Sequence, residues 1–240
     1  METIQEIIQW VTYQSNNSAP AYALIASLAL GFYSYFFPYT HRYVKLFGSL
    51  IHEAGHATMA LFLGLRVNKI KLDSHGNGVT EFYSHSRLRN FPVALAGYIG
   101  PPTLAALLAW TISNHMLNAA IAILIFTFIL LTIFVRSFVA IFINLLLGGI
   151  IYLAFTIAPS VSSIVMFIFI GMLLSSGIMG VVSAYKVRLR EGKDAGTDPQ
   201  VLARMTLIIP AIIWELLFLV FSIAMTLLTL IILLAPQILL

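Results

Sequence analysis

The sequence predicts an all-α polytopic membrane protein with about seven transmembrane helices and one small β-hairpin after the second of them. Hydrophobic residues make up 60% of the 240-residue chain and charged residues only 9%, whereas roughly a quarter of the residues in a soluble domain are charged. Apolar runs recur along the chain, each long enough to cross about 30 Å of hydrocarbon. The expected helices cover 19–38, 44–65, 91–112, 117–135, 138–157, 161–185 and 206–234.

The composition of the chain also limits which side chains could bind a metal and which partners are expected. The chain has no cysteine, so a metal site would have to use His, Asp, Glu or Asn side chains. The formal charge of +4 comes from Lys and Arg that flank the apolar runs, where membrane orientation and anionic lipids account for them. A lipid bilayer is therefore an expected partner, and a nucleic acid is not.

The first apolar run is expected to remain in the protein as a span. The preceding residues 1–18 contain Glu2 and Glu6 but no Lys or Arg, and they show no small-residue cleavage pattern. They do not look like a cleaved signal peptide.

The second run carries the most informative motif of the chain, HExxH, at residues 52–56. Side chains four residues apart share one face of a helix, so the imidazoles of His52 and His56 can hold one zinc ion. Glu53 lies beside that face, where a carboxylate can take a proton from water and later give it to a leaving amine. Ionisable side chains are costly in hydrocarbon and usually mark function there. We therefore predict peptidase chemistry inside a membrane segment.

The segment after this helix predicts a β-hairpin. Residues 66–72 and 79–83 have the composition of short strands, and the turn between them is rich in glycine. Two roles are open for it: a solvated loop that caps the helices, or an edge strand beside the metal that pairs with an unwound substrate segment.

Residues 117–157 are predicted to form two helices. Only Arg136 and Ser137 interrupt this 41-residue apolar stretch, but at about 1.5 Å per residue one helix of that length would be too long to span a bilayer. No Gly or Pro marks the expected turn.

The distribution of Lys and Arg predicts an orientation. If the loops 66–90 and 186–205 and the turn at Arg136 face the cytosol, eleven of the thirteen positive residues lie inside, and only Arg42 and Lys45 lie outside. With seven spans, the N-terminus is then cytosolic and the C-terminus is not.

HExxH supplies two ligands, whereas a catalytic zinc site needs three from the protein. The best candidate for the third lies in the stretch 196–204, just before the last apolar run, which contains Thr197 and Asp198. Either side chain would also serve simply to cap a helix that begins at Pro199.

Two polar residues in later apolar runs are rivals for this position. Glu215 is an ionisable group well inside the last run, although it would equally suit an ion pair with Arg204 or Arg136. Asn144 is a candidate ligand, but an interhelical hydrogen bond is the commonest role of such a residue.

Several of these segments together resemble the site-2-protease-like intramembrane zinc metalloproteases. The shared segments are 46–56, the hairpin, 97–102 and the late stretch 197–204, so the resemblance covers roughly residues 45–110 and 194–220. The chain is most similar to a compact branch without a PDZ or CBS domain, which implies one integral membrane domain over 1–240. The resemblance implies His52 and His56 as zinc ligands, Glu53 as catalytic base and Asp198 as the third ligand.

The chain also departs from this family. Better-known members carry Asn-Pro-Asp-Gly or Leu-Asp-Gly on a later span. Residues 144–149 resemble this motif at most weakly, and they lack its aspartate. In addition, His52 and His56 lie near the middle of a predicted span, whereas Asp198 lies close to a membrane surface. Either the last helix starts inside the bilayer, or another residue completes the site.

The function expected from the sequence is that of a zinc metalloendopeptidase that hydrolyses peptide bonds in or near transmembrane segments of other membrane proteins. The resemblance favours a bacterial inner membrane, in which the chain is a multi-pass protein. The alternative is a non-catalytic zinc-binding membrane protein, such as a sensor, a transporter or a pseudoprotease chaperone. Two features argue against it: the chain has no internal repeat of the kind common in transporters, and zinc binding alone does not require Glu53.

Overall fold

A computed structural model describes residues 19–73, 76–84, 86–192 and 195–238. The predicted absence of a cleaved signal peptide concerns residues 1–18, which lie outside this range. The elements are α2 (Ala21–Tyr33), α3 (Pro38–Phe62), β1 (Arg66–Leu72), β2 (Gly78–Tyr83), α4 (Arg87–Ser113), α5 (Leu117–Phe134), α6 (Phe138–Ile157), α7 (Pro159–Glu191), α8 (Asp198–Thr206) and α9 (Ala211–Ile238).

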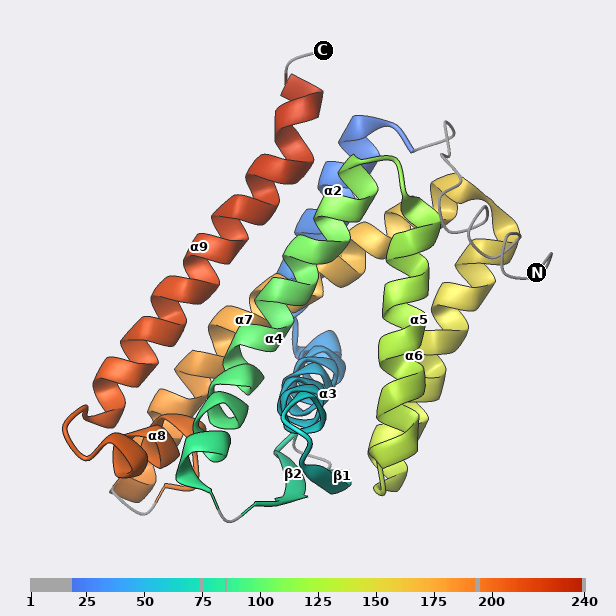
Figure 1. Ribbon diagram of the computed structural model, residues 1–240. Coiled ribbons are helices and arrows are strands. Elements are labelled where there is room, and N and C mark those ends of the chain that lie inside the picture. The colour runs from blue at the N-terminus through green and yellow to red at the C-terminus, as the bar shows by residue number, and fades with distance from the viewer. Residues whose placement is uncertain (1–18, 74–75, 85, 193–194, 239–240) are drawn as a thin grey trace.

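The fold confirms the predicted class, an all-helical membrane protein with one small hairpin. Within the described part of the chain, α4, α5, α6, α7 and α9 are long and apolar enough to cross a membrane, and they run roughly side by side as a bundle (Figure 1). All seven predicted apolar runs are helical. The first two, α2 and α3, form a pair bent by 87°, which brings the number of candidate spans to six if the pair counts as one.

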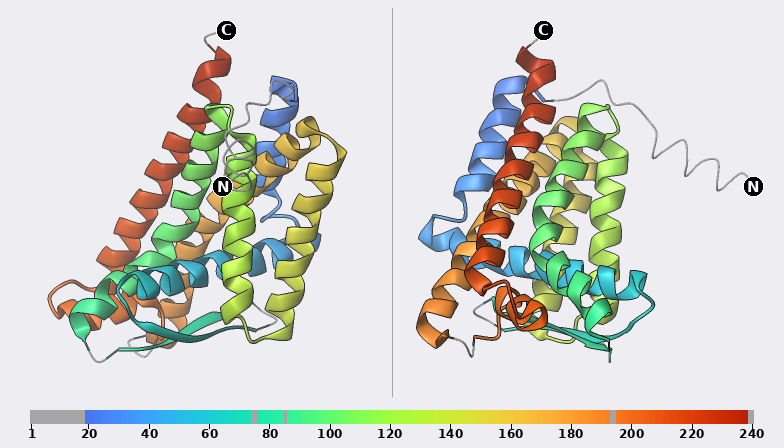
Figure 2. Two further views of the ribbon diagram at one scale, coloured as in Figure 1. Left: turned by 45° about the vertical axis from the view of Figure 1, so that its right-hand side comes forward. Right: turned by 60° about the vertical axis from the view of Figure 1, so that its left-hand side comes forward.

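The bend between α2 and α3 changes the expected course of the chain. Pro38 is the first residue of α3, and Phe37 before it has an extended backbone with φ −81° and ψ 131°, because proline disfavours the helical conformation of the residue that precedes it. As a result α3 lies across the bundle instead of along it (Figure 2). The start of α2 and the described end of α9 therefore lie at the same end of the bundle (Figure 1). The predicted side of the N-terminus itself falls on residues outside the described range.

Apolar contacts hold α3 in this crosswise position. Phe47 and Leu50 are fully buried, and the Phe47 ring packs edge to face against Phe169 of α7 with ring centroids 5.4 Å apart. Burial of this apolar face leaves the opposite, polar face of α3 turned toward the hairpin, α4 and α8.

The hairpin forms as predicted, with β1 and β2 antiparallel and an irregularity between Val67 and Lys69. The outer edge of β1 meets the turn between α5 and α6: Ile70 forms a parallel bridge with Val135, and the Leu72 amide donates to the Ser137 hydroxyl over 3.1 Å. This contact confirms the predicted break near Arg136, and it shows that the turn, which has no Gly or Pro, is stabilised by the hairpin.

Positive charge collects at the hairpin end of the bundle. The described Lys and Arg residues lie on α3 and the hairpin, at the start of α4, in the α5–α6 turn, in the last turns of α7 and on α8, all toward one end (Figure 2). Arg42 and Lys45, which were expected outside, are on α3, and the Lys45 side chain adjoins Gly76 in the hairpin turn. Because α3 lies across the bundle, Lys45 lies beside the hairpin with the other positive residues, and the side of the membrane that these residues face stays a prediction.

Candidate metal centre

One polar stripe of α3 faces a cavity of about 830 Å³. Lys45, Ser49, His52 and His56 follow one another at spacings of four, three and four residues, so they share a helix face, and all four line the cavity together with residues of β2, α4, α7 and the segment around α8. The HExxH motif thus opens onto this cavity, whose lining includes both polar and apolar side chains.

The two histidines point toward each other. Their Nε2 atoms lie 3.1 Å apart, and His56 is 93% buried, with 7% of its surface exposed. The Nδ1 atom of His56 lies 2.6 Å from the Val93 carbonyl oxygen of α4, so Nδ1 carries the proton that it donates to this acceptor. In that tautomer Nε2 has a free lone pair, which is the arrangement that ligating histidines show in metal sites.

Gly97 of α4 allows the close approach of α4 to this face. A Cβ atom at Gly97 would lie 2.4 Å from the Nε2 atom of His56 and 2.6 Å from the Cε1 atom of His52. Any side chain here would therefore occupy the space in front of both imidazoles. The neighbours that Gly97 packs against are the two motif histidines.

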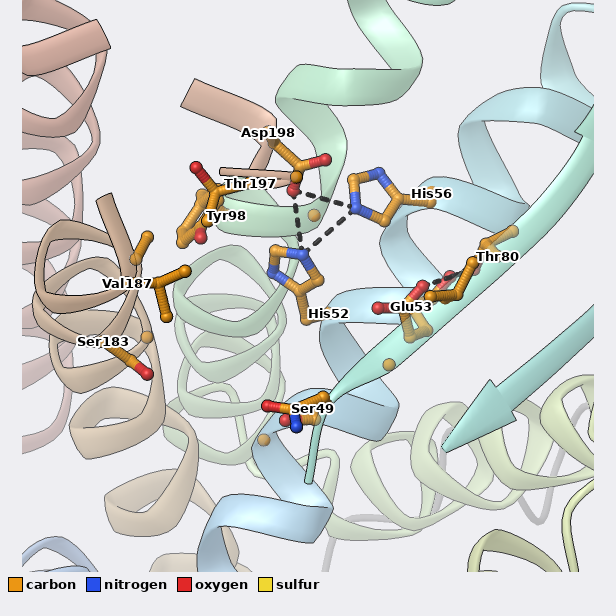
Figure 3. A pocket seen from close by; sticks show the side chains of 18 of the residues that line it. Ser49, His52, Glu53, His56, Thr80, Tyr98, Ser183, Val187, Thr197 and Asp198 are labelled. Atoms are coloured by element: carbon orange, nitrogen blue, oxygen red, sulfur yellow. Dashed lines mark hydrogen bonds and ion pairs between the residues drawn. The ribbon is translucent and has the colours of Figure 1, made fainter. Parts of the chain in front are cut away.

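Asp198 completes a triangle of electron-pair donors. Its Oδ2 atom lies 3.0 Å from Nε2 of His52 and 3.2 Å from Nε2 of His56, as Figure 3 shows with dashed lines. A tetrahedral zinc ion with bonds of about 2.0–2.1 Å separates its ligand atoms by roughly 3.3 Å. The spacing and the two-nitrogen, one-oxygen donor set therefore fit zinc, and these three residues form a group that could hold a metal ion.

The crosswise course of α3 removes the difference in depth between the motif and Asp198. Asp198 is the first residue of α8, which follows the last turns of α7 at the hairpin end, and α3 passes at that end (Figure 2). The last helix therefore does not have to start inside the bilayer, and no other residue is needed to complete the group, because His52 and His56 lie at the same end of the bundle as Asp198.

The capping role considered for this segment is not observed. Thr197 is the N-cap residue of α8 but makes no side-chain capping hydrogen bond, and its buried hydroxyl oxygen has no hydrogen-bond partner. Asp198 instead turns to the histidines. Burial alone would raise the pKa of the Asp198 carboxyl, but the imidazoles of His56 and His52, when they are protonated in the absence of a metal, hold that pKa well below its usual range.

Glu53 lies beside the triangle, on the side of the hairpin (Figure 3). Its side chain is buried, with 4% of its surface exposed, and its Oε2 atom accepts a 2.6 Å hydrogen bond from the Thr80 hydroxyl of β2. Glu53 and Thr80 both line the cavity, so the carboxylate can reach a water molecule there.

The two rival ligand candidates lie elsewhere. Glu215 of α9 forms an ion pair with Arg188 of α7, with both carboxylate oxygens 2.8 Å from guanidinium nitrogens, so neither of the partners suggested by the sequence is the one observed. The Asn144 amide donates to the Phe128 carbonyl oxygen over 2.9 Å, which is an α5–α6 interhelical bond. Neither residue lines the cavity.

Sequence reasoning missed the supporting residues of the site. Besides Thr80 and the Val93 carbonyl, they include Tyr98, whose ring packs edge to face on His52 with centroids 4.6 Å apart and stacks on Phe218 of α9. Tyr98 stands next to Gly97 in a stretch that the resemblance had already singled out, but no local signal distinguishes it from an ordinary core tyrosine.

Comparison with known proteins gives one result. A family described as Peptidase M50B-like matches residues 23–229. No curated protein matches, and no solved structure matches.

Proposed function

Since this chain belongs to the Peptidase M50B-like family, we propose that it is a zinc metalloendopeptidase that cleaves peptide bonds in or near the transmembrane segments of other membrane proteins. The observation that carries the proposal is the convergence of His52, His56 and Asp198 on one point, with Glu53 directly after His52 on the same helix. A purely structural cluster does not require a buried carboxylate held beside such a point.

Each residue has a defined part in this proposal. His52, His56 and Asp198 hold zinc, which when bound supplies Lewis acidity, lowering the pKa of water and polarising a peptide carbonyl. Glu53 accepts the proton of the attacking water at its carboxylate and then donates it to the nitrogen of the leaving amine. The Val93 carbonyl fixes the His56 ring, so that Nε2 stays aimed at the metal.

The hairpin supports a binding mode for the substrate. The outer edge of β1 is in contact with the α5–α6 turn, whereas β2 lines the cavity with Gly78, Val79, Thr80 and Phe82. A helical substrate hides its carbonyls in intrahelical hydrogen bonds, so it must unwind before attack. An unwound segment that pairs with β2 would present its backbone next to Glu53.

The charge distribution supports an orientation with the cavity near the cytosolic face. The positive residues gather at the hairpin end, and Lys and Arg are enriched on the cytosolic side of membrane proteins. We place the chain in a bacterial inner membrane, with the loops 66–90 and 186–205 on the cytosolic side and single-span membrane proteins as substrates.

The test measures zinc content and cleavage together. Wild type, Glu53→Gln, Asp198→Ala and the control Glu215→Gln are purified in detergent, assayed for zinc and incubated with a panel of single-span substrates. The proposal expects one zinc per chain and cleavage in wild type, zinc without cleavage in Glu53→Gln, and loss of both in Asp198→Ala. Glu215→Gln should keep its zinc, because Glu215 lies outside the cavity.

Other outcomes separate the alternatives. Absence of zinc from every variant would overturn the metallopeptidase proposal. Bound zinc with no cleavage of any substrate would favour the non-catalytic sensor, transporter or chaperone, and zinc retained by Asp198→Ala would remove Asp198 from the ligand set.

A further inference from the structure

We propose that Thr80 of β2 is the positioning residue that orients Glu53 for catalysis, an inference that rests on the proposed function. The Thr80 hydroxyl lies 2.6 Å from Oε2 of Glu53 and 3.2 Å from the Glu53 backbone oxygen. A hydroxyl that donates to a buried carboxylate restricts the rotation of that carboxylate. Hydrogen bonds to an ionised group are about twice as strong as neutral ones.

A second position on the same strand shapes the space around this carboxylate. Side chains two residues apart point to the same face of a strand, and Gly78 precedes Thr80 by two. A Cβ atom at Gly78 would lie 2.4 Å from Oε1 of Glu53. Gly78 thus leaves room for one carboxylate oxygen, while Thr80 binds the other.

The hairpin is itself fixed at both sides, which is what a positioning role requires. The Ser49 hydroxyl of α3 donates to the Gly76 carbonyl oxygen over 2.6 Å, and β1 is joined to the α5–α6 turn through Ile70 and Leu72. Thr80 is therefore held relative to α3 by contacts that do not involve Glu53.

The outward face of β2 provides a matched control. Glu81 alternates with Thr80 and pairs with Lys69 over 3.2 Å and with Lys71 over 3.4 Å, away from Glu53. Glu81→Gln weakens these ion pairs of the hairpin without touching the base. It therefore separates general weakening of the hairpin from loss of the Thr80 hydrogen bond.

The activity test compares Thr80→Val, which has the same shape but no hydroxyl, with Thr80→Ser, which keeps the hydroxyl. In the zinc-loaded enzyme, Thr80→Val is expected to lower kcat roughly 10- to 100-fold with KM and zinc content unchanged, because a misplaced catalytic group costs rate and not ground-state binding. Thr80→Ser and Glu81→Gln should stay within about threefold of wild type. Equal kcat in Thr80→Val and wild type would overturn the proposal, as would a loss of activity explained by lost zinc or a raised KM.

A second measurement needs no activity. A double-mutant cycle of Thr80→Val and Glu53→Ala on thermal unfolding of the metal-free protein is expected to be non-additive, because each single change removes the same hydrogen bond. Additive shifts in Tm would overturn the contact. If wild type cleaves no substrate, the proposed function fails, while this cycle still reports on the Thr80–Glu53 contact.

Discussion

The orientation of the imidazoles in the candidate centre depends on a backbone carbonyl and a glycine of α4. The His56 ring is oriented by the Val93 carbonyl, and both imidazoles fill the space where Gly97 has no side chain. Both contacts come from α4, so at the scale of single residues the site depends on how closely α4 approaches α3.

Substitution of Gly97 is expected to weaken zinc binding without touching a ligand. In Gly97→Ala the new Cβ would lie 2.4 Å from Nε2 of His56, so the ring must turn. A disturbed supporting shell typically costs about 10- to 100-fold in metal affinity. Competition with a fluorescent zinc chelator measures this change.

The control is Gly149→Ala on α6, where nothing lies within 4 Å of the added Cβ. Its zinc affinity should equal that of wild type. An unchanged affinity in Gly97→Ala would mean that the imidazoles do not need the space in front of Gly97.

Two helices hold the element that carries Asp198. The segment with α8 joins α7 to α9, and the ion pair between Arg188 and Glu215 connects these helices near the start and end of that segment. The carboxylate of Glu215 is 97% buried, since its side chain is only 3% exposed, so Arg188 is its necessary partner.

Removal of Arg188 alone is expected to be strongly destabilising. Arg188→Met leaves Glu215 as an uncompensated buried charge, which costs about 3–5 kcal/mol. The double variant Arg188→Met/Glu215→Leu replaces the pair by apolar side chains and should recover most of the loss. Thermal unfolding in detergent measures both.

The double variant should also retain zinc, because neither Arg188 nor Glu215 belongs to the group of His52, His56 and Asp198 that could hold the metal. A single variant as stable as wild type would show that Arg188 is not needed to compensate Glu215. Zinc loss from a fully folded double variant would return Glu215 to the list of candidate ligands.

At this scale, the sequence predicted which segments are helical better than it predicted how they lie. Apolar runs are local properties, and all seven became helices, while the HExxH spacing pointed to three residues that do line the cavity. The crosswise course of α3 depends on Pro38 together with the burial of Phe47 and Leu50 against other helices, which periodicity does not report. Thr80 escaped notice because its partner is 27 residues away in sequence.

At the scale of the whole molecule, the described residues form a bundle with charged side chains at one end and none at the other. The start of α2, the α4–α5 turn, the α6–α7 turn and the described end of α9 carry no Lys, Arg, Asp or Glu. The cavity lies at the other end, where its lining includes Lys45, Lys186 and Arg190. This separation is more complete than the sequence suggested, since Arg42 and Lys45 join the other positive residues.

The chain lacks cysteine, so its orientation can be mapped with single introduced thiols. In intact cells a membrane-impermeant thiol reagent is expected to label Asn114→Cys, in the α4–α5 turn, and to label Glu191→Cys, at the end of α7, only after the membrane is opened. Cleavage or zinc content of each variant serves as the control for folding. The reverse pattern would place the cavity at the extracytosolic face.

The crosswise position of α3 has a consequence for the products. Under the proposed function and orientation, a bond cut at the level of His52 and His56 would lie toward one leaflet, so it would divide a spanning substrate unequally. The fragment on the far side would keep most of the apolar segment and stay anchored. The cytosolic fragment would keep far fewer than the roughly 20 apolar residues that hold a helix in a bilayer, so it would dissociate into water, and a single hydrolysis would turn a membrane-bound protein into a soluble one.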